Sequence, residues 1–65
     1  MDSFLIKDVF GTRDQILAHN EKDALKKYAV KNQLDLYNVH QLNFSKTWCM
    51  SCSRNRFFIA VPIMT

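Results

Sequence analysis

The stretch His19–Leu34 constrains the fold more than any other part of the chain, because it alone has a convincing helix pattern. Asn20 is a good N-cap, since its side chain can accept from free backbone N–H groups of the first turn, and Asp23 follows as a capping-box acid. We expect a left-handed stop at Asn32, with Leu34 folding back onto the helix. The apolar positions form one narrow stripe: Ala24, Leu25, Tyr28 and Ala29.

A single helix cannot enclose a core, so the flanking segments must supply a sheet. Alternating apolar residues predict a strand over 3–10, and Gly11 is placed where the chain must reverse. A short second strand is expected over 15–18, the alternative being a loop. A further strand is expected over 36–44, with either a β-bulge near His40 and Gln41 or two partly covered faces.

The C-terminal part predicts a hairpin of strands 46–52 and 56–63, in which Ser53, Arg54 and Asn55 form the turn and Asn55 best tolerates a left-handed backbone. In its last strand, one set of side chains is assigned to the core: Phe57, Ile59, Val61 and Ile63. The prediction is one α+β domain over 1–65, with an antiparallel sheet of three to five strands, one helix on one face, and the order β-(β)-α-β-β-β.

Charge is distributed unevenly along the chain. Residues 1–35 contain six acidic and six basic residues, whereas residues 36–65 contain three basic residues and no acid, which gives the net charge of +3. This distribution favours an acidic partner, either nucleic acid or an acidic protein surface. No apolar run reaches the ~20 residues of a membrane span, and no signal sequence is recognised, so we expect a cytoplasmic protein without a membrane partner.

Catalysis is not expected. One glycine cannot form a phosphate-binding loop, no acid follows Asp35, and a chain of 65 residues has little room for a pocket of ~300 Å³. Cys49 and Cys52 form a C-x-x-C motif. This motif could be a redox pair, or it could form a zinc site together with His19 and His40. The spacing matches no zinc-finger pattern, and we favour two reduced apolar cysteines, with no metal and no cofactor.

Binding fits the sequence better. Two sets of side chains are candidate partner-binding residues. The first set forms a cationic, aromatic hairpin: Lys46, Trp48, Arg54 and Arg56. The second set forms a basic helix face: Lys26, Lys27 and Lys31. The alternatives to binding are that Trp48 belongs to the core and that the helix lysines form an ordinary solvated face.

A second apolar sheet face is also expected, because some apolar residues alternate away from the face assigned to the core. These residues are Leu5, Val9, Phe58 and Ala60. Such a partly apolar face, or alternatively an open strand edge at the terminus, favours a protein partner or a homodimer.

The segment 16–42 follows strand, A-x-N-x-x-D-A-L-x-x-Y-A, strand, with the motif residues Ala18, Asn20, Asp23, Ala24, Leu25, Tyr28 and Ala29. It resembles the strand–helix–strand core of small phage-encoded inhibitors, such as the host RNA polymerase inhibitor of T7-like phages and small anti-CRISPR proteins. The resemblance implies a compact binder that uses no cofactor and no catalysis.

We therefore expect an inhibitor or modulator that docks on a larger host protein or protein–nucleic acid complex and blocks it sterically. Direct nucleic-acid binding through the hairpin is the alternative. Either a monomer or a homodimer is compatible with the sequence.

Overall fold

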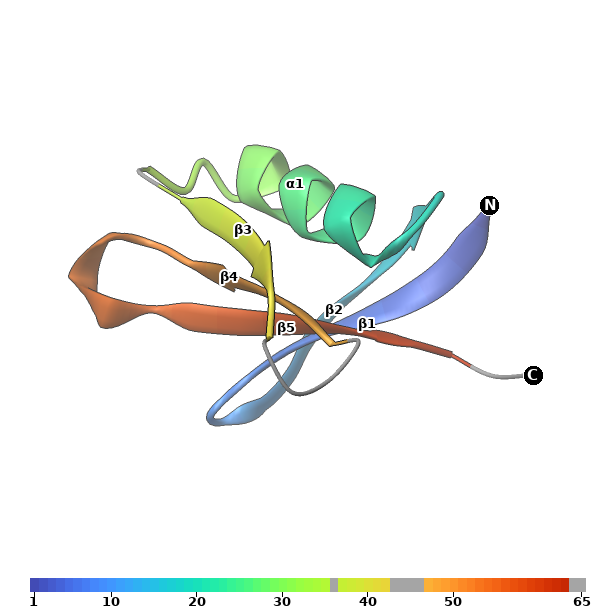
Figure 1. Ribbon diagram of the computed structural model, residues 1–65, viewed down its shortest axis with the longest axis horizontal. Coiled ribbons are helices and arrows are strands. Elements are labelled where there is room, and N and C mark those ends of the chain that lie inside the picture. The colour runs from blue at the N-terminus through green and yellow to red at the C-terminus, as the bar shows by residue number, and fades with distance from the viewer. Residues whose placement is uncertain (36, 43–46, 64–65) are drawn as a thin grey trace.

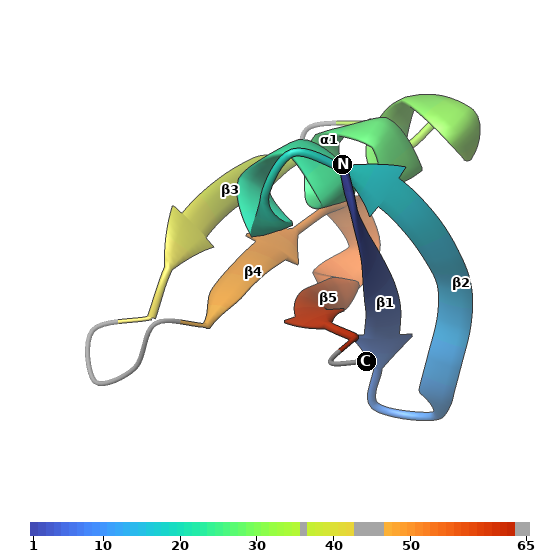
Figure 2. The same cartoon turned by 90° about the vertical axis from the view of Figure 1, so that its right-hand side faces the viewer.

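A computed structural model describes residues 1–35, 37–42 and 47–63. They form five strands and one α-helix, and the strands make one antiparallel sheet with the spatial order β2-β1-β5-β4-β3 (Figures 1 and 2). The elements are β1 (Asp2–Asp8), β2 (Gly11–Ala18), α1 (Glu21–Lys31), β3 (Asn38–Gln41), β4 (Trp48–Ser51), the 3₁₀ turn η1 (Ser53–Asn55) and β5 (Phe57–Pro62). The predicted α+β fold, with one helix on a sheet of about five strands, is confirmed.

Helix α1 begins as its sequence predicts. The Asn20 side chain accepts a hydrogen bond of 2.8 Å from the backbone N–H of Asp23, and the Asp23 carboxylate accepts one of 3.1 Å from the backbone N–H of His19. These reciprocal bonds satisfy donors that the first turn leaves free. At 11 residues, α1 is too short to cross a membrane, and the described segments contain no other α-helix that could.

The helix ends one residue later than predicted. Asn32 is not left-handed, with φ of −102°, and Gln33 takes that conformation instead, with φ of +54°. The backbone N–H groups of Gln33 and Leu34 then donate to the carbonyls of Val30 (3.2 Å) and Ala29 (2.9 Å), which is a Schellman motif. Leu34 does fold back and pack against the core, as expected.

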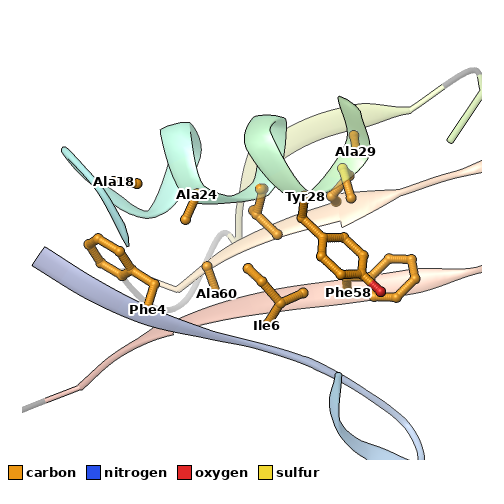
Figure 3. Close-up of a cluster of buried hydrophobic side chains, with 10 residues drawn as sticks. Phe4, Ile6, Ala18, Ala24, Tyr28, Ala29, Phe58 and Ala60 are labelled. Carbon is orange, nitrogen blue, oxygen red and sulfur yellow. The ribbon is translucent and has the colours of Figure 1, made fainter. Parts of the chain in front are cut away.

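The core lies between α1 and one face of the sheet (Figure 3). The expected helix stripe is buried, and the Tyr28 ring packs on the Phe58 ring at 5.1 Å between centroids. Phe4 and Ile6 of β1 and Ala60 of β5 complete the layer beneath the helix. This layer fixes which face of each strand points away from the helix.

The faces of β5 were predicted wrongly. Phe58 and Ala60 point toward the helix, whereas Phe57, Ile59 and Val61 lie on the opposite face. The register explains the inversion: Ile6 pairs with Ala60 and Leu5 pairs with Val61, so residues on the same face of β1 and β5 follow these pairs.

The first reversal also differs from the prediction. Asp8 pairs with Gly11, so Val9 and Phe10 form the turn and β2 starts at Gly11 rather than at residue 15. Gly11 has φ of +121°, which glycine adopts without strain. Phe10, which the predicted strand over 3–10 included, is instead exposed at the turn.

Strand β3 is shorter than the predicted segment, and it pairs with β4 without a bulge from Asn38 to Gln41. The sheet does have an irregularity, but in β2. Ile6 pairs with Asp14 and Lys7 pairs with Thr12, so Arg13 is the extra residue of a β-bulge. Leu36 and Phe44, which entered the predicted strand, lie outside the described residues.

Candidate functional site

No described segment covers the sheet face opposite the helix (Figure 2). We call it the open face and define it by five apolar side chains from β1, β2 and β5: Leu5, Leu17, Phe57, Ile59 and Val61. The strand register places Ser3, Lys7 and Gln15 on the same face. Leu17 and Phe57 leave 61% and 41% of their surface exposed, and the other three apolar side chains are partly buried by their neighbours. A contiguous apolar surface of this kind is typical of an interaction site.

At one end of the open face, two turns from distant parts of the chain come together. Because β1 and β5 are antiparallel neighbours, the end of β1 lies beside the start of β5, and the β1–β2 and β4–β5 turns share that end of the sheet (Figure 1). We call their exposed residues the two-turn tip: Val9, Phe10, Arg13, Arg54 and Arg56. Val9 and Phe10 are 84% and 85% exposed.

Asp8 organises the first of these turns. One of its carboxylate oxygens accepts from the backbone N–H of Phe10 at 2.8 Å, and the other pairs with Nε of Arg13. The Arg13 guanidinium also lies 5.8 Å from the centre of the Phe10 ring. The bulge at Arg13 therefore turns its side chain toward the tip, where it holds an apolar turn in place.

The same bonds set the charge of the tip. Desolvation raises the pKa of Asp8, but the hydrogen bonds from Arg13 and the Phe10 N–H, with the charges of Arg13 and Arg56, outweigh it and hold the pKa of this carboxyl below its ordinary value. Asp8 is therefore ionised at neutral pH and offsets one of the three arginine charges, which leaves a net charge of +2. Among the described residues, Arg54 and Arg56 have no carboxylate within ion-pair distance.

The second turn places its arginines through its backbone. Arg54 takes the left-handed conformation, with φ of +64°, which the sequence had favoured for Asn55. The backbone N–H of Cys52 donates to the carbonyl of Arg56 at 2.9 Å and closes the turn. The Arg56 guanidinium lies 5.2 Å from the centre of the Phe58 ring, so this side chain is held beside the core.

Two hollows adjoin each other at the tip. A hollow of about 300 Å³ is bordered by the three arginines and by residues that include Asp8, Val9, Phe10 and Phe57. An apolar hollow of about 180 Å³ lies between Val9, Phe57 and Ile59 and is bordered by Lys7 and Asp8. Asp8, Val9 and Phe57 border both hollows, so the two meet at the end of the sheet. The larger one lies toward the helix side, with Arg56 and Phe58, and the smaller one lies on the open face.

The structure separates the residues that the sequence grouped on the hairpin. Arg54 and Arg56 lie together at the two-turn tip, whereas Trp48 begins β4 at the other end of the hairpin, on the helix side of the sheet. Trp48 is partly buried against the core, and Lys22 lies 5.8 Å from the centre of its ring. Lys46 lies outside the described residues.

The helix lysines have different surroundings. Nζ of Lys31 pairs with Asp14 of β2 at 2.8 Å, and Nζ of Lys27 donates to the Leu17 carbonyl at 3.2 Å and lies 3.4 Å from Asp23. These two side chains connect the helix to strand β2. Lys26 is exposed and has no ion-pair partner within the described segments.

The possible zinc ligands are not assembled. Cys49 Sγ lies 3.1 Å from Nε2 of His40 on the neighbouring strand, but the described residues contain no cluster of three or more metal-ligating side chains. Cys49 and Cys52 are free thiols, and burial raises the pKa of both. Neither is therefore activated as a thiolate in this environment.

Three residues of the tip were not predicted from the sequence: Phe10, Arg13, and Val9 as a residue of the turn. One signal was available, because Val9 and Phe10 precede the only glycine of the chain and could have been read as a turn with apolar residues at its exposed end. Comparison with protein-family models, with curated proteins and with solved structures found no match for this chain.

Proposed function

We propose that this protein is a non-catalytic binding module that docks on a larger protein complex through its open face and two-turn tip. It acts by occluding the surface that it covers, as an inhibitor or modulator does. The resemblance of the 16–42 segment to small phage-encoded inhibitors suggests a host complex of the transcription or defence machinery as the target.

One observation supports the proposal: the open face, which no described segment covers, carries a group of apolar side chains and ends at an exposed tip that contains Phe10 and three arginines. Apolar surface gains about 25 cal/mol for each Å² that a partner removes from water. Aromatic residues and arginine are also enriched at protein interfaces and among the residues that dominate their binding energy.

Nucleic-acid binding is the second candidate, and the two-turn tip favours it. Arg54 and Arg56 could pair with phosphates, and the exposed ring of Phe10 could stack on a base. The two candidates differ in their response to salt, because phosphate contacts weaken steeply as salt rises and apolar contacts do not.

The test is affinity capture from a bacterial lysate, at low and high salt and with and without nuclease, using three forms of the protein. The first is wild type, and the second carries Leu17→Ser and Val61→Thr, which make the open face more polar. The third carries Val30→Thr, a matched control because Val30 is exposed on the helix, away from the sheet.

We expect wild type and the Val30 control to retain the same protein complex after nuclease and high salt, and the open-face variant to lose it. Capture that disappears with nuclease would support nucleic-acid binding instead. Equal capture by all three forms would refute a docking role for the open face, and a doubled mass of the wild type in solution, lost in the open-face variant, would assign that face to a homodimer.

A further inference from the structure

The two adjoining hollows at the tip differ in chemistry, and together they describe a ligand. The larger one, of about 300 Å³, is bordered by Arg13, Arg54 and Arg56 and lies toward the helix side of the sheet end. The smaller one, of about 180 Å³, lies on the open face between Val9, Phe57 and Ile59, with Lys7 and Asp8 at its border. A ligand that reaches from one hollow to the other passes around the end of the sheet and carries an apolar group next to negative charge.

We propose that the two-turn tip is a peptide-binding site for an acidic segment with a single apolar anchor. The anchor side chain enters the apolar hollow, and carboxylates flanking it pair with Arg54 and Arg56. This inference rests on the proposed protein-binding function, because it names the chemistry of the segment that the partner presents.

The charges of the tip are arranged for this ligand. Both carboxylate oxygens of Asp8 accept hydrogen bonds, from Arg13 and from the Phe10 N–H. Asp8 forms no ion pair with Arg54 or Arg56, although the charge of Arg56 acts on it. Arg54 and Arg56 have no carboxylate partner among the described residues, and they lie on one short turn. Guanidinium groups bind carboxylates through paired, charge-assisted hydrogen bonds, which are shorter and stronger than neutral ones.

The same geometry favours a peptide over a nucleic acid. A strand of nucleic acid needs a groove of cations that follows its backbone over several nucleotides. Here the two unpaired arginines lie on one short turn at the end of the sheet. Within the described residues, the open face adds one cation, Lys7, to a set of apolar side chains: Leu5, Leu17, Ile59 and Val61. Apolar side chains do not attract phosphates, but they do accommodate the anchor of a peptide and the surface of the protein that carries it.

The experiment selects ligands from a displayed library of random twelve-residue peptides. Wild type is compared with a charge-reversed tip, Arg54→Asp with Arg56→Glu. Aspartate is chosen at position 54 because it tolerates the left-handed backbone there. The matched control is Lys22→Glu with Lys26→Glu, which changes the net charge equally on the exposed helix surface. Circular dichroism confirms that each variant folds.

We expect wild type and the helix control to enrich peptides in which one large apolar residue has at least two acidic neighbours. The affinity of a selected peptide, measured by fluorescence anisotropy, should fall at least tenfold with the charge-reversed tip and stay within twofold with the helix control. Val9→Thr, which makes the wall of the apolar hollow more polar at nearly constant shape, should weaken binding severalfold without changing the preference for acidic residues.

Three results would overturn the inference: selected peptides with no acidic preference, unchanged affinity of the charge-reversed tip, or a twelve-nucleotide poly-dT probe that binds wild type more tightly than any peptide and is lost from that variant. If instead the enriched peptides are apolar and are lost only with Leu17→Ser and Val61→Thr, the acidic segment is wrong while the protein-binding function stands. If no peptide is enriched and the lysate capture is also empty, both proposals fail.

Discussion

Adjacent phenylalanines in β5 give the sharpest test of the fold, because Phe57 and Phe58 lie on opposite faces of the sheet. Phe58 is 1% exposed and packs on the Tyr28 ring, whereas Phe57 is 41% exposed on the open face. Truncation of a buried phenylalanine to alanine costs about 3–5 kcal/mol. A domain of 65 residues has a free energy of unfolding of about 3–10 kcal/mol in total. We therefore expect Phe58→Ala to lose at least about a third of its free energy of unfolding.

Phe57→Ala should cost much less. Complete burial of a phenylalanine contributes about 1.5–3 kcal/mol, and Phe57 is little more than half buried, so we expect a loss of roughly 1 kcal/mol. The variant should remain folded and lose affinity for its ligand, because Phe57 borders both hollows of the tip.

The assay is urea denaturation followed by far-ultraviolet circular dichroism and by the fluorescence of Trp48, which packs against the core. Phe58→Leu keeps most of the side-chain volume and should lose less than about 1.5 kcal/mol, so it provides a measurable value if Phe58→Ala does not fold. If Phe57→Ala is as unstable as Phe58→Ala, or less stable, the assignment of the two faces is wrong.

Three further predictions concern the helix and its surroundings. Asn20→Ala removes the cap on the Asp23 N–H and should lower the free energy of unfolding by about 1 kcal/mol in the same urea assay, and an unchanged midpoint would contradict the cap. Gln33→Gly relieves the left-handed strain at φ of +54° and should raise the free energy of unfolding by about 0.5–1 kcal/mol; destabilisation would show that glycine's entropy in the unfolded chain outweighs that strain. The Lys31 hydrogen bond, opposed by desolvation, lowers the pKa of Asp14, so its stabilisation is complete above about pH 4 and is lost as the pH falls through the folded-state pKa. Urea midpoints from pH 7 to pH 2 should therefore fall less for Asp14→Asn than for wild type, and parallel curves would refute the role of this pair.

Helix α1 could be predicted from sequence because its signals are local. The Asn20 cap, the buried stripe and the return of Leu34 all lie within one short segment, and the structure contains each of them. The error of one residue at the C-terminus, Gln33 for Asn32, has a local cause: residue preferences favour asparagine there, but the hydrogen bonds to the Ala29 and Val30 carbonyls require the turn one position later.

The faces of β5 could not be predicted in the same way, because both are apolar. The larger set, Phe57, Ile59 and Val61, looked like the core from size alone. The helix instead approaches the sheet closely over small residues, and Figure 3 shows Ala24 of α1 opposite Ala60 of β5, both almost fully buried. Close approach of a helix selects for small side chains beneath it, which a pattern of hydrophobicity does not reveal.

The two-turn tip could not be predicted from the sequence, because it is formed by a contact between segments near the two ends of the chain. Arg54 and Arg56 were chosen for their charge, but their neighbours Val9 and Phe10 come from the first hairpin, and only the pairing of β1 with β5 brings them together. Turns usually carry glycine, asparagine, aspartate, serine or proline, because these residues fit the backbone and water. Val9 and Phe10 instead expose apolar side chains to solvent, where they contribute little to folding. The unusual composition of this turn therefore supports the proposed contact with a partner, which the charge-reversed tip and Val9→Thr test.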